Sequence, residues 1–118
     1  MRTLVIGAST NPERYAYKAI ESLVQNKYSV AALGHKSGQI FGVSIETIPQ
    51  PLVAIDTITL YLNPTRQQQY YAYIIALKPR RVIFNPGTEN QELYELLTQN
   101  NIAYEVACTL VLLATKQF

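Results

Sequence analysis

Charged residues are scarce in this sequence. Asp, Glu, Lys and Arg make up 15% of the 118 residues, whereas an average soluble domain has about 25%. Ten Lys and Arg face eight Asp and Glu, so the net charge is only +2. This charge is too small to drive nucleic-acid binding by counterion release. We therefore expect no nucleic-acid partner, and a surface that is either rich in uncharged polar side chains or partly covered by a partner.

Cysteine, histidine and long apolar runs are also scarce. Cys108 is the single cysteine and His35 the single histidine, so we expect neither an internal disulfide nor a metal site. No run approaches the 18 consecutive apolar residues that a membrane helix needs. A charged start followed by an apolar signal run is absent as well. These features predict a cytoplasmic protein with no membrane partner.

Apolar residues account for 48% of the chain and occur along its whole length, which predicts one domain over residues 1–118. They alternate between short runs typical of strands and stripes with helical spacing. We expect strands at 4–6, 28–33, 56–62, 81–84 and 102–107, and helices at 16–24, 63–77, 88–97 and from 109 onward. Residues 34–55 are interpreted as a loop that crosses a sheet edge.

This alternation predicts the fold class. Strands that alternate with helices form parallel sheets with right-handed crossovers and helices on both faces. We therefore expect an α/β protein, a Rossmann-like doubly wound three-layer fold with a five-stranded parallel sheet. Ligands of such folds bind beyond the carboxyl ends of the strands, where the strand order reverses. The loops that follow the strands are thus the candidate binding segments.

The loop after the first strand carries the clearest signal. Small residues begin the run 7–14, GASTNPER, and allow a ligand to approach the backbone closely. Backbone amides at the start of the next helix can hold a diphosphate, with Ser9, Thr10 and Arg14 as further donors. The alternative is an ordinary tight turn. The run is not the GxGxxG fingerprint, since Ser9 and Pro12 occupy the second and third glycine positions.

The end of the second strand points away from NAD. NAD sites of this fold place an Asp or Glu there to hold the ribose. This chain has Gly34, His35 and Lys36 instead, and no carboxylate follows the strand until Glu46. A basic pair suits a phosphorylated ribose, as in coenzyme A or NADP. The alternative is that both side chains are simply solvated.

Four stretches of the sequence carry a family resemblance. The runs VIGASTNPERYAYKAIESLVQNKYSV, IFGVSIETIPQPLVAID, VIFNPGTENQEL and EVACT resemble the small free-standing CoA-binding proteins. These are similar to the CoA-binding domain of the succinyl-CoA synthetase alpha subunit. The resemblance covers nearly the whole chain, and its most specific parts are the loop 7–14 and the stretch 41–49.

The resemblance implies a set of binding residues. Its diphosphate loop matches Gly7, Ala8, Ser9, Pro12 and Arg14, and Lys36 matches a lysine near the phosphorylated adenosine. The rest of the coenzyme is implied to lie against Leu62, Asn63, Asn85, Pro86 and Gly87. The sequence also departs from the family. Gly34 and His35 replace a common Asn and Pro, and Ala107 replaces an Arg. An arginine that the family often has soon after the third strand has no match at Tyr61 or Leu62, and Arg66 comes a few residues late.

Cys108 matches a cysteine that the family often has after the last strand. Its apolar neighbours favour an inert, structural thiol, and the alternative is a thiol that meets the pantetheine end of the coenzyme. On one predicted helix, Tyr71 and Ile75 share a face that could support a homodimer.

Together these features predict a coenzyme A or acyl-CoA binding protein without catalytic residues. His35 has no nucleophile beside it, and a ligase of this lineage needs a second domain. Two alternatives stay open: an NADP-binding oxidoreductase-like subunit, and a protein-interaction module that has lost its nucleotide.

Overall fold

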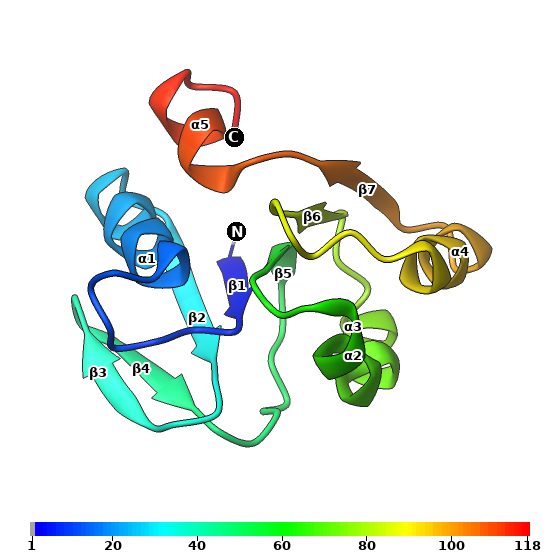
Figure 1. Cartoon of the computed structure of the whole chain (residues 1–118), viewed down its shortest axis with the longest axis horizontal. Helices are drawn as coiled ribbons and strands as arrows, with labels where there is room; N and C mark the ends of the chain where they lie inside the picture. The colour runs from blue at the N-terminus through cyan, green and yellow to red at the C-terminus, as the bar shows by residue number, and fades with distance from the viewer. Residues whose placement is uncertain (1) are drawn as a thin grey trace.

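The computed structural model describes residues 2–118, which form one sheet between two layers of helices (Figure 1). Strands and helices follow one another in the order β1 (Arg2–Ile6), α1 (Tyr15–Gln25), β2 (Ser29–Leu33), β3 (Gly38–Ile40), β4 (Val43–Glu46), β5 (Ile55–Leu60), α2 (Pro64–Gln67), the 3₁₀ turn η1 (Gln68–Tyr70), α3 (Tyr71–Leu77), β6 (Arg81–Phe84), α4 (Gln91–Gln99), β7 (Ala103–Val106) and α5 (Thr109–Ala114). The five strands predicted from apolar runs correspond to β1, β2, β5, β6 and β7.

The sheet has seven strands in the order β3-β4-β2-β1-β5-β6-β7. All neighbouring strands pair in parallel except β3 and β4, which are antiparallel. The chain moves outward from β1 in one direction to β2 and β4 and in the other to β5, β6 and β7, so the strand order reverses at β1. The doubly wound architecture is thus confirmed, and the predicted five-stranded, purely parallel sheet is wrong.

The difference lies in residues 38–46, which were interpreted as loop. They form a β-hairpin whose two-residue turn, Phe41 and Gly42, has φ angles of 51° and 79°. Left-handed angles at both turn positions match the twist of an antiparallel pair. In β4, buried Val43 and Ile45 alternate with exposed residues. The hairpin then extends the sheet because β4 pairs with the end of β2.

The helices were mostly placed correctly, but the predicted helix 63–77 is interrupted. It consists of α2, the turn η1 and α3, with Tyr70 leaving helical geometry at φ −106° and ψ 0°. A 3₁₀ turn within a helical segment marks a local constraint on the chain. The side chain of Gln67, the residue directly before this turn, is fully buried.

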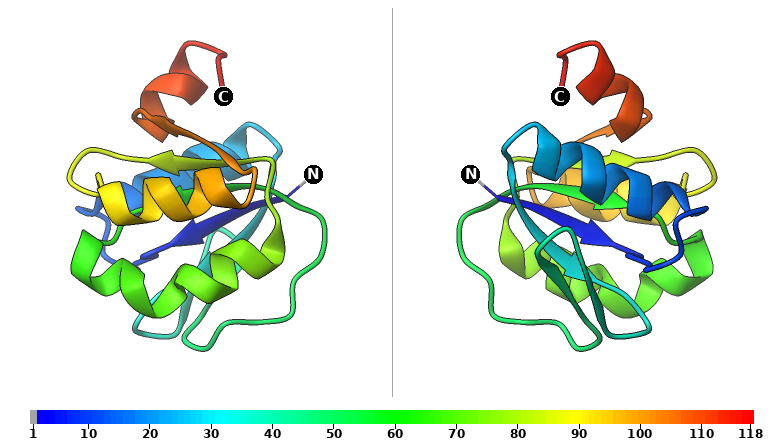
Figure 2. Two further views of the ribbon diagram at one scale, coloured as in Figure 1. Left: turned by 90° about the vertical axis from the view of Figure 1, so that its right-hand side faces the viewer. Right: turned by 90° about the vertical axis from the view of Figure 1, so that its left-hand side faces the viewer.

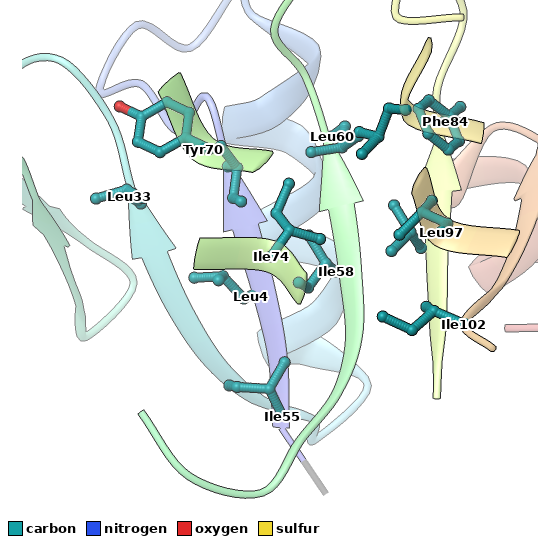
Figure 3. Close-up of a cluster of buried hydrophobic side chains, with 13 residues drawn as sticks. Leu4, Leu33, Ile55, Ile58, Leu60, Tyr70, Ile74, Phe84, Leu97 and Ile102 are labelled. Carbon is teal, nitrogen blue, oxygen red and sulfur yellow. The ribbon is translucent and has the colours of Figure 1, made fainter. Parts of the chain in front are cut away.

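Two hydrophobic cores lie on opposite faces of the sheet. One contains Leu4, Ile58, Leu60, Phe84 and other residues packed under α3 and α4 (Figure 3). The other joins Val5 and Ile45 to α1 and α5, and Figure 2 shows these helix layers from both sides. Burial of both faces accounts for the continuous apolar runs of the central strands.

The helix face predicted to support a homodimer takes part in internal packing. Tyr71 and Ile75 are half-buried and pack against the core under α3 and α4. The Tyr71 hydroxyl also donates a hydrogen bond to the Glu92 carboxylate at 2.9 Å. Tyr71 and Ile75 therefore take part in internal packing with one side of each residue, and a self-association face there stays a prediction. Among residues 2–118, none of the helices is both long and apolar enough to cross a membrane.

Candidate functional site

A cleft of about 560 Å³ lies beyond the carboxyl ends of β1, β2, β5 and β6. Its walls come from four segments that are far apart in sequence: 7–16, 34–36, 61–70 and 86–88. Figure 2 shows the loop after β1, the start of α2 and the loop after β6 gathered at the same end of the sheet. This is the position at which doubly wound folds bind ligands.

The turn between β1 and α1 presents free backbone donors to the cleft. Gly7 has φ +96°, and the amides of Gly7 and Ala8 both donate to the Leu33 carbonyl, at 2.8 and 3.0 Å. The next two amides, of Ser9 and Thr10, donate to no acceptor among residues 2–118. The Ser9 hydroxyl instead accepts a hydrogen bond from the Asn11 amide at 3.0 Å. This turn therefore leaves two amides available to an anion.

The start of α1 adds further free backbone amides to those of the turn. Its N-cap residue is Arg14, and arginine is not one of the residues that commonly cap helices. Accordingly, the Arg14 side chain makes no capping hydrogen bond. By contrast, Asn63 and Asn90 cap α2 and α4. In the described part of the chain, the amides of Tyr15, Ala16 and Tyr17 have no acceptor. Unpaired amides and the positive end of the helix dipole together favour a bound anion.

Basic residues line the cleft. Arg14, His35, Lys36 and Arg66 line it, and no Asp or Glu is among its lining residues. None of these four belongs to the two ion pairs of the described chain, Arg80–Asp56 and Arg81–Glu105. A chain with a net charge of only +2 thus concentrates unpaired positive charge at one place, which raises the local potential for an anionic ligand.

Two glycines let the walls of the cleft meet closely. A Cβ on Gly34 would lie 2.4 Å from the Ala8 carbonyl oxygen, and one on Gly38 would lie 2.6 Å from Cγ2 of Thr10. The Ala8 oxygen is backbone and cannot rotate away, so glycine is required at position 34 for the loop after β1 to pack on the end of β2. The Thr10 methyl is the end of a side chain and can shift, so the constraint at Gly38 is weaker. Gly34 is one of the positions at which the sequence departs from the family, and the close contact with Ala8 explains why a glycine stands there.

The structure brings together most of the residues predicted for the site. Nine of them line the cleft: Gly7, Ala8, Ser9, Arg14, Lys36, Leu62, Asn63, Pro86 and Gly87. Pro12, Asn85 and Cys108 do not line it. Pro12 is exposed, and Cys108 is half-buried at the N-cap of α5.

Asn85 has a structural part instead. It is 2% exposed, and its amide nitrogen donates to the Thr59 hydroxyl at 2.6 Å and to the Leu60 carbonyl at 2.9 Å. Its amide oxygen accepts from the Thr109 backbone at 2.8 Å. The side chain therefore ties β5, β6 and the start of α5 together and has no donor left for a ligand.

Arg66 also lines the cleft, although in sequence it comes a few residues too late to match the arginine of the family. It follows the α2 N-cap Asn63 by three residues, and its amide donates to the Asn63 side chain at 3.0 Å. The Asn-Pro pair at 63–64 is a helix-start signal, and it would have placed Arg66 in the first helical turn, at the carboxyl edge of the sheet. The cleft has this fourth basic side chain in the wall opposite Lys36.

Tyr61, which also lines the cleft, carries a buried hydroxyl that has no hydrogen-bond partner among the described residues. The nearby Thr59 and Thr109 hydroxyls bond to each other at 2.8 Å. Burial raises the pKa of the Tyr61 phenol to about 12, against the lowering effect of the Thr109 and Thr59 hydroxyls. The fold therefore disfavours the phenolate.

Replacing Tyr61 with phenylalanine is expected to make the protein less sensitive to base. Because the phenol pKa is raised in the fold, its contribution to stability is complete below pH 10 and is lost as the pH rises toward 12. Two pH units correspond to about 2–3 kcal/mol. Urea unfolding at pH 8 and at pH 11–12 should show the wild type losing more stability than Tyr61→Phe. Equal losses in the two proteins would contradict the burial of this phenol.

A second hollow, of about 430 Å³, lies over β2 and β4 beside the loop 50–52. Leu4, Leu33 and Tyr73 are among the residues that line it. None of the residues predicted for the site lies there. In residues 2–118, no group of three or more His, Cys, Asp or Glu could hold a metal ion.

Comparison with solved structures gives the same fold. The crystal structure of an uncharacterized protein matches with a TM-score of 0.96 and 44% identity, over 99% of this chain and 97% of that one. A Thermus thermophilus protein matches with a TM-score of 0.86 and 19% identity, over 99% and 90%. The dinucleotide-forming acetyl-coenzyme A synthetase 1 of Ca. Korarchaeum cryptofilum matches with 0.72 and 12%, over 87% of this chain and 25% of that one.

The matches to the Thermus thermophilus protein and to the synthetase have identities of 19% and 12%, so they establish the fold alone. No curated protein matches the chain. A family model, that of the CoA binding domain, matches residues 1–114 and so includes every wall of the cleft. The chain therefore belongs to the CoA-binding domain family.

Proposed function

We propose that this protein binds coenzyme A or an acyl-CoA in the cleft and performs no chemistry on it. The observation that carries the proposal is the uncapped start of α1, which opens into a cleft lined by basic residues. Membership of the CoA-binding domain family supports a CoA-related ligand. The protein's part in this proposal is to recognise the coenzyme through its phosphates.

The free amides supply the diphosphate subsite. The Ser9, Thr10, Tyr15 and Ala16 amides have no internal acceptor and belong to residues that line the cleft. Arg14, between the turn and the helix, adds a guanidinium that suits paired phosphate oxygens. A diphosphate bound here would give the helix the cap that its sequence lacks.

Lys36 supplies the subsite for a third phosphate. It follows β2, with Gly34 packed against the Ala8 carbonyl, so it stands beside the proposed diphosphate subsite. An NAD ribose would require a carboxylate at this place, and the cleft has none. A phosphorylated ribose fits the lysine, which distinguishes coenzyme A from dephospho-coenzyme A and from NAD.

Calorimetric titration with coenzyme A, dephospho-coenzyme A, NADP and NAD tests this function. We expect coenzyme A to bind best. Dephospho-coenzyme A should bind about tenfold or more weakly, because a hydrogen bond to a charged group contributes about 1.5–3 kcal/mol. NAD should bind least. Binding of NADP without binding of coenzyme A would overturn the proposal in favour of an oxidoreductase-like subunit, and no binding of either would overturn it altogether.

Cys108 is expected to stay unmodified when the protein is incubated with coenzyme A under mild oxidation. The thiol lies at the start of α5 and outside the cleft lining, so a coenzyme held there does not present its own thiol to Cys108. Peptide mapping by mass spectrometry measures the adduct. A mixed disulfide at Cys108 that forms at the rate of coenzyme binding would show instead that the pantetheine end meets this residue.

A further inference from the structure

Gln67 and Asn90 form a buried polar network behind the wall of the cleft that α2 and the loop after β6 build. Gln67 is fully buried and Asn90 is 7% exposed. The Gln67 amide nitrogen donates to the Leu62 and Thr88 carbonyls, both at 2.8 Å. The Gln67 amide oxygen accepts from Asn90 at 2.8 Å. We name these three hydrogen bonds the Gln67 clasp.

The chemistry of the partners fixes the orientation of both amides. Only an NH₂ group can face two carbonyl oxygens, so the Gln67 amide cannot be turned around. Asn90 must then present its own NH₂ to the Gln67 oxygen, and its second hydrogen goes to the Tyr71 hydroxyl at 2.8 Å. The Asn90 oxygen accepts from the Leu93 amide at the start of α4. Each donor of the clasp is thus committed, and breaking it leaves buried carbonyls without partners.

The clasp joins two cleft loops that the sheet does not join. Pairing between β5 and β6 ends at Leu60 and Phe84. Beyond that point, no backbone hydrogen bond of the described chain links residues 61–63 to residues 85–90. Leu62 and Thr88, whose carbonyls Gln67 holds, both line the cleft. Asn85 ties the ends of β5 and β6 together, and beyond it the Gln67 side chain links the two loops.

We propose that Gln67 is a positioning residue that sets the shape of this wall and, through it, the binding of the part of the ligand beyond the phosphates. The inference rests on the proposed function. The phosphate subsites lie on the other wall, at 8–16 and 36, and make no use of the clasp. A ligand that consists only of the phosphorylated nucleotide should not depend on Gln67, whereas one with a pantetheine arm should.

Calorimetry with two ligands tests this division in Gln67→Met, which keeps the length of the side chain and removes its donors. Coenzyme A is expected to bind about tenfold or more weakly than to the wild type. Adenosine 3′-phosphate 5′-diphosphate, which lacks the arm, should change less than about twofold. Ile74→Val and Ile74→Ala, in the core away from the cleft, are the stability controls. Their losses in the free energy of unfolding should lie on either side of the loss in Gln67→Met. Equal weakening of both ligands, or of neither, would overturn the proposal.

Gln67→Glu provides a readout that a purely structural role would not give. A protonated glutamic acid can donate to one carbonyl, whereas its carboxylate repels both. The ratio of its coenzyme A dissociation constant to that of the wild type should fall several-fold between pH 8.5 and pH 5.5, and the ratio for Gln67→Met should stay constant. A constant ratio for Gln67→Glu would contradict the clasp.

A measurement without ligand separates this inference from the proposed function. Spin labels at exposed Thr65 and Gln91, in a Cys108→Ala background, report the distance between α2 and α4. Gln67→Met should broaden the distance distribution, and an unchanged width would overturn the clasp. If the wild type binds neither ligand, the proposed function fails, and this width alone decides whether Gln67 sets the wall.

Discussion

Replacing Gly34 with alanine is expected to abolish detectable coenzyme A binding and to lower the stability of the protein. The added Cβ would lie 2.4 Å from the Ala8 carbonyl oxygen, which is backbone and cannot rotate away. The loop after β1 must therefore move, and the hydrogen bonds from the Gly7 and Ala8 amides to Leu33 must lengthen. Forcing an extra carbon into a packed site costs about 1–3 kcal/mol. Calorimetry and urea unfolding measure the two effects.

Gly42→Ala is the matched control. Gly42 has φ +79° and no atom within 4 Å of an added Cβ, so alanine there meets only the left-handed backbone strain, about 1 kcal/mol. We expect this variant to lose some stability and to bind coenzyme A as the wild type does. Normal coenzyme A binding by a folded Gly34→Ala protein would show that the close approach of the two loops does not form the site.

Lys36→Gln is expected to weaken coenzyme A binding by about tenfold to a hundredfold, and dephospho-coenzyme A binding by less than about twofold. The loss of one charge-assisted hydrogen bond, about 1.5–3 kcal/mol, sets this range. Arg14→Gln should weaken the two ligands equally, because both contain the diphosphate. Titration calorimetry at one fixed salt concentration measures both variants.

Lys27→Gln is the control for a change in net charge. Lys27 is exposed and follows the C-terminal end of α1, at the opposite end of the helix from the cleft. It should bind both ligands as the wild type does. A Lys36→Gln protein that loses affinity for both ligands by the same factor would mean that Lys36 acts as a general positive charge and not on the third phosphate.

Apolar periodicity predicted the central part of the fold. The runs around Leu4, Ile58 and Ile83 are buried on both faces of a parallel sheet, and such strands are continuous in their hydrophobicity. The hairpin was missed because its first strand has three residues and its turn places Phe41 at φ 51°. Left-handed geometry is rare for a bulky side chain, so no turn signal marks that position.

The position of the candidate residues in the cleft could be predicted where it depends on local sequence. Gly7, Arg14 and Lys36 lie in the segments that follow β1 and β2, and the ends of parallel strands meet at one edge of the sheet. Long-range contacts decide the other positions. Asn85 also follows a strand, but its amide is used by Thr59, Leu60 and Thr109. Such a set of partners cannot be derived from the sequence around residue 85.

Gly34 and Gln67 depend on long-range contacts in the same way. Gly34 is constrained by a carbonyl 26 residues earlier in the chain, and Gln67 holds a carbonyl 21 residues later. In sequence, Gln67 is one of three consecutive glutamines that suggest an exposed polar helix face. Only the folded chain shows that the first of them is fully buried.

Amide chemical shifts of ¹⁵N-labelled protein during titration with coenzyme A test the central claim most directly, because each proposed donor is observed by itself. The amides of Ser9, Thr10, Tyr15, Ala16 and Lys36 are predicted to shift in a saturable manner with one dissociation constant. Those of Gly42 and Ser44, in the second hollow, should stay unchanged. Shifts confined to Gly42, Ser44 and Leu52, or no shifts at a millimolar concentration of the coenzyme, would contradict the proposed site.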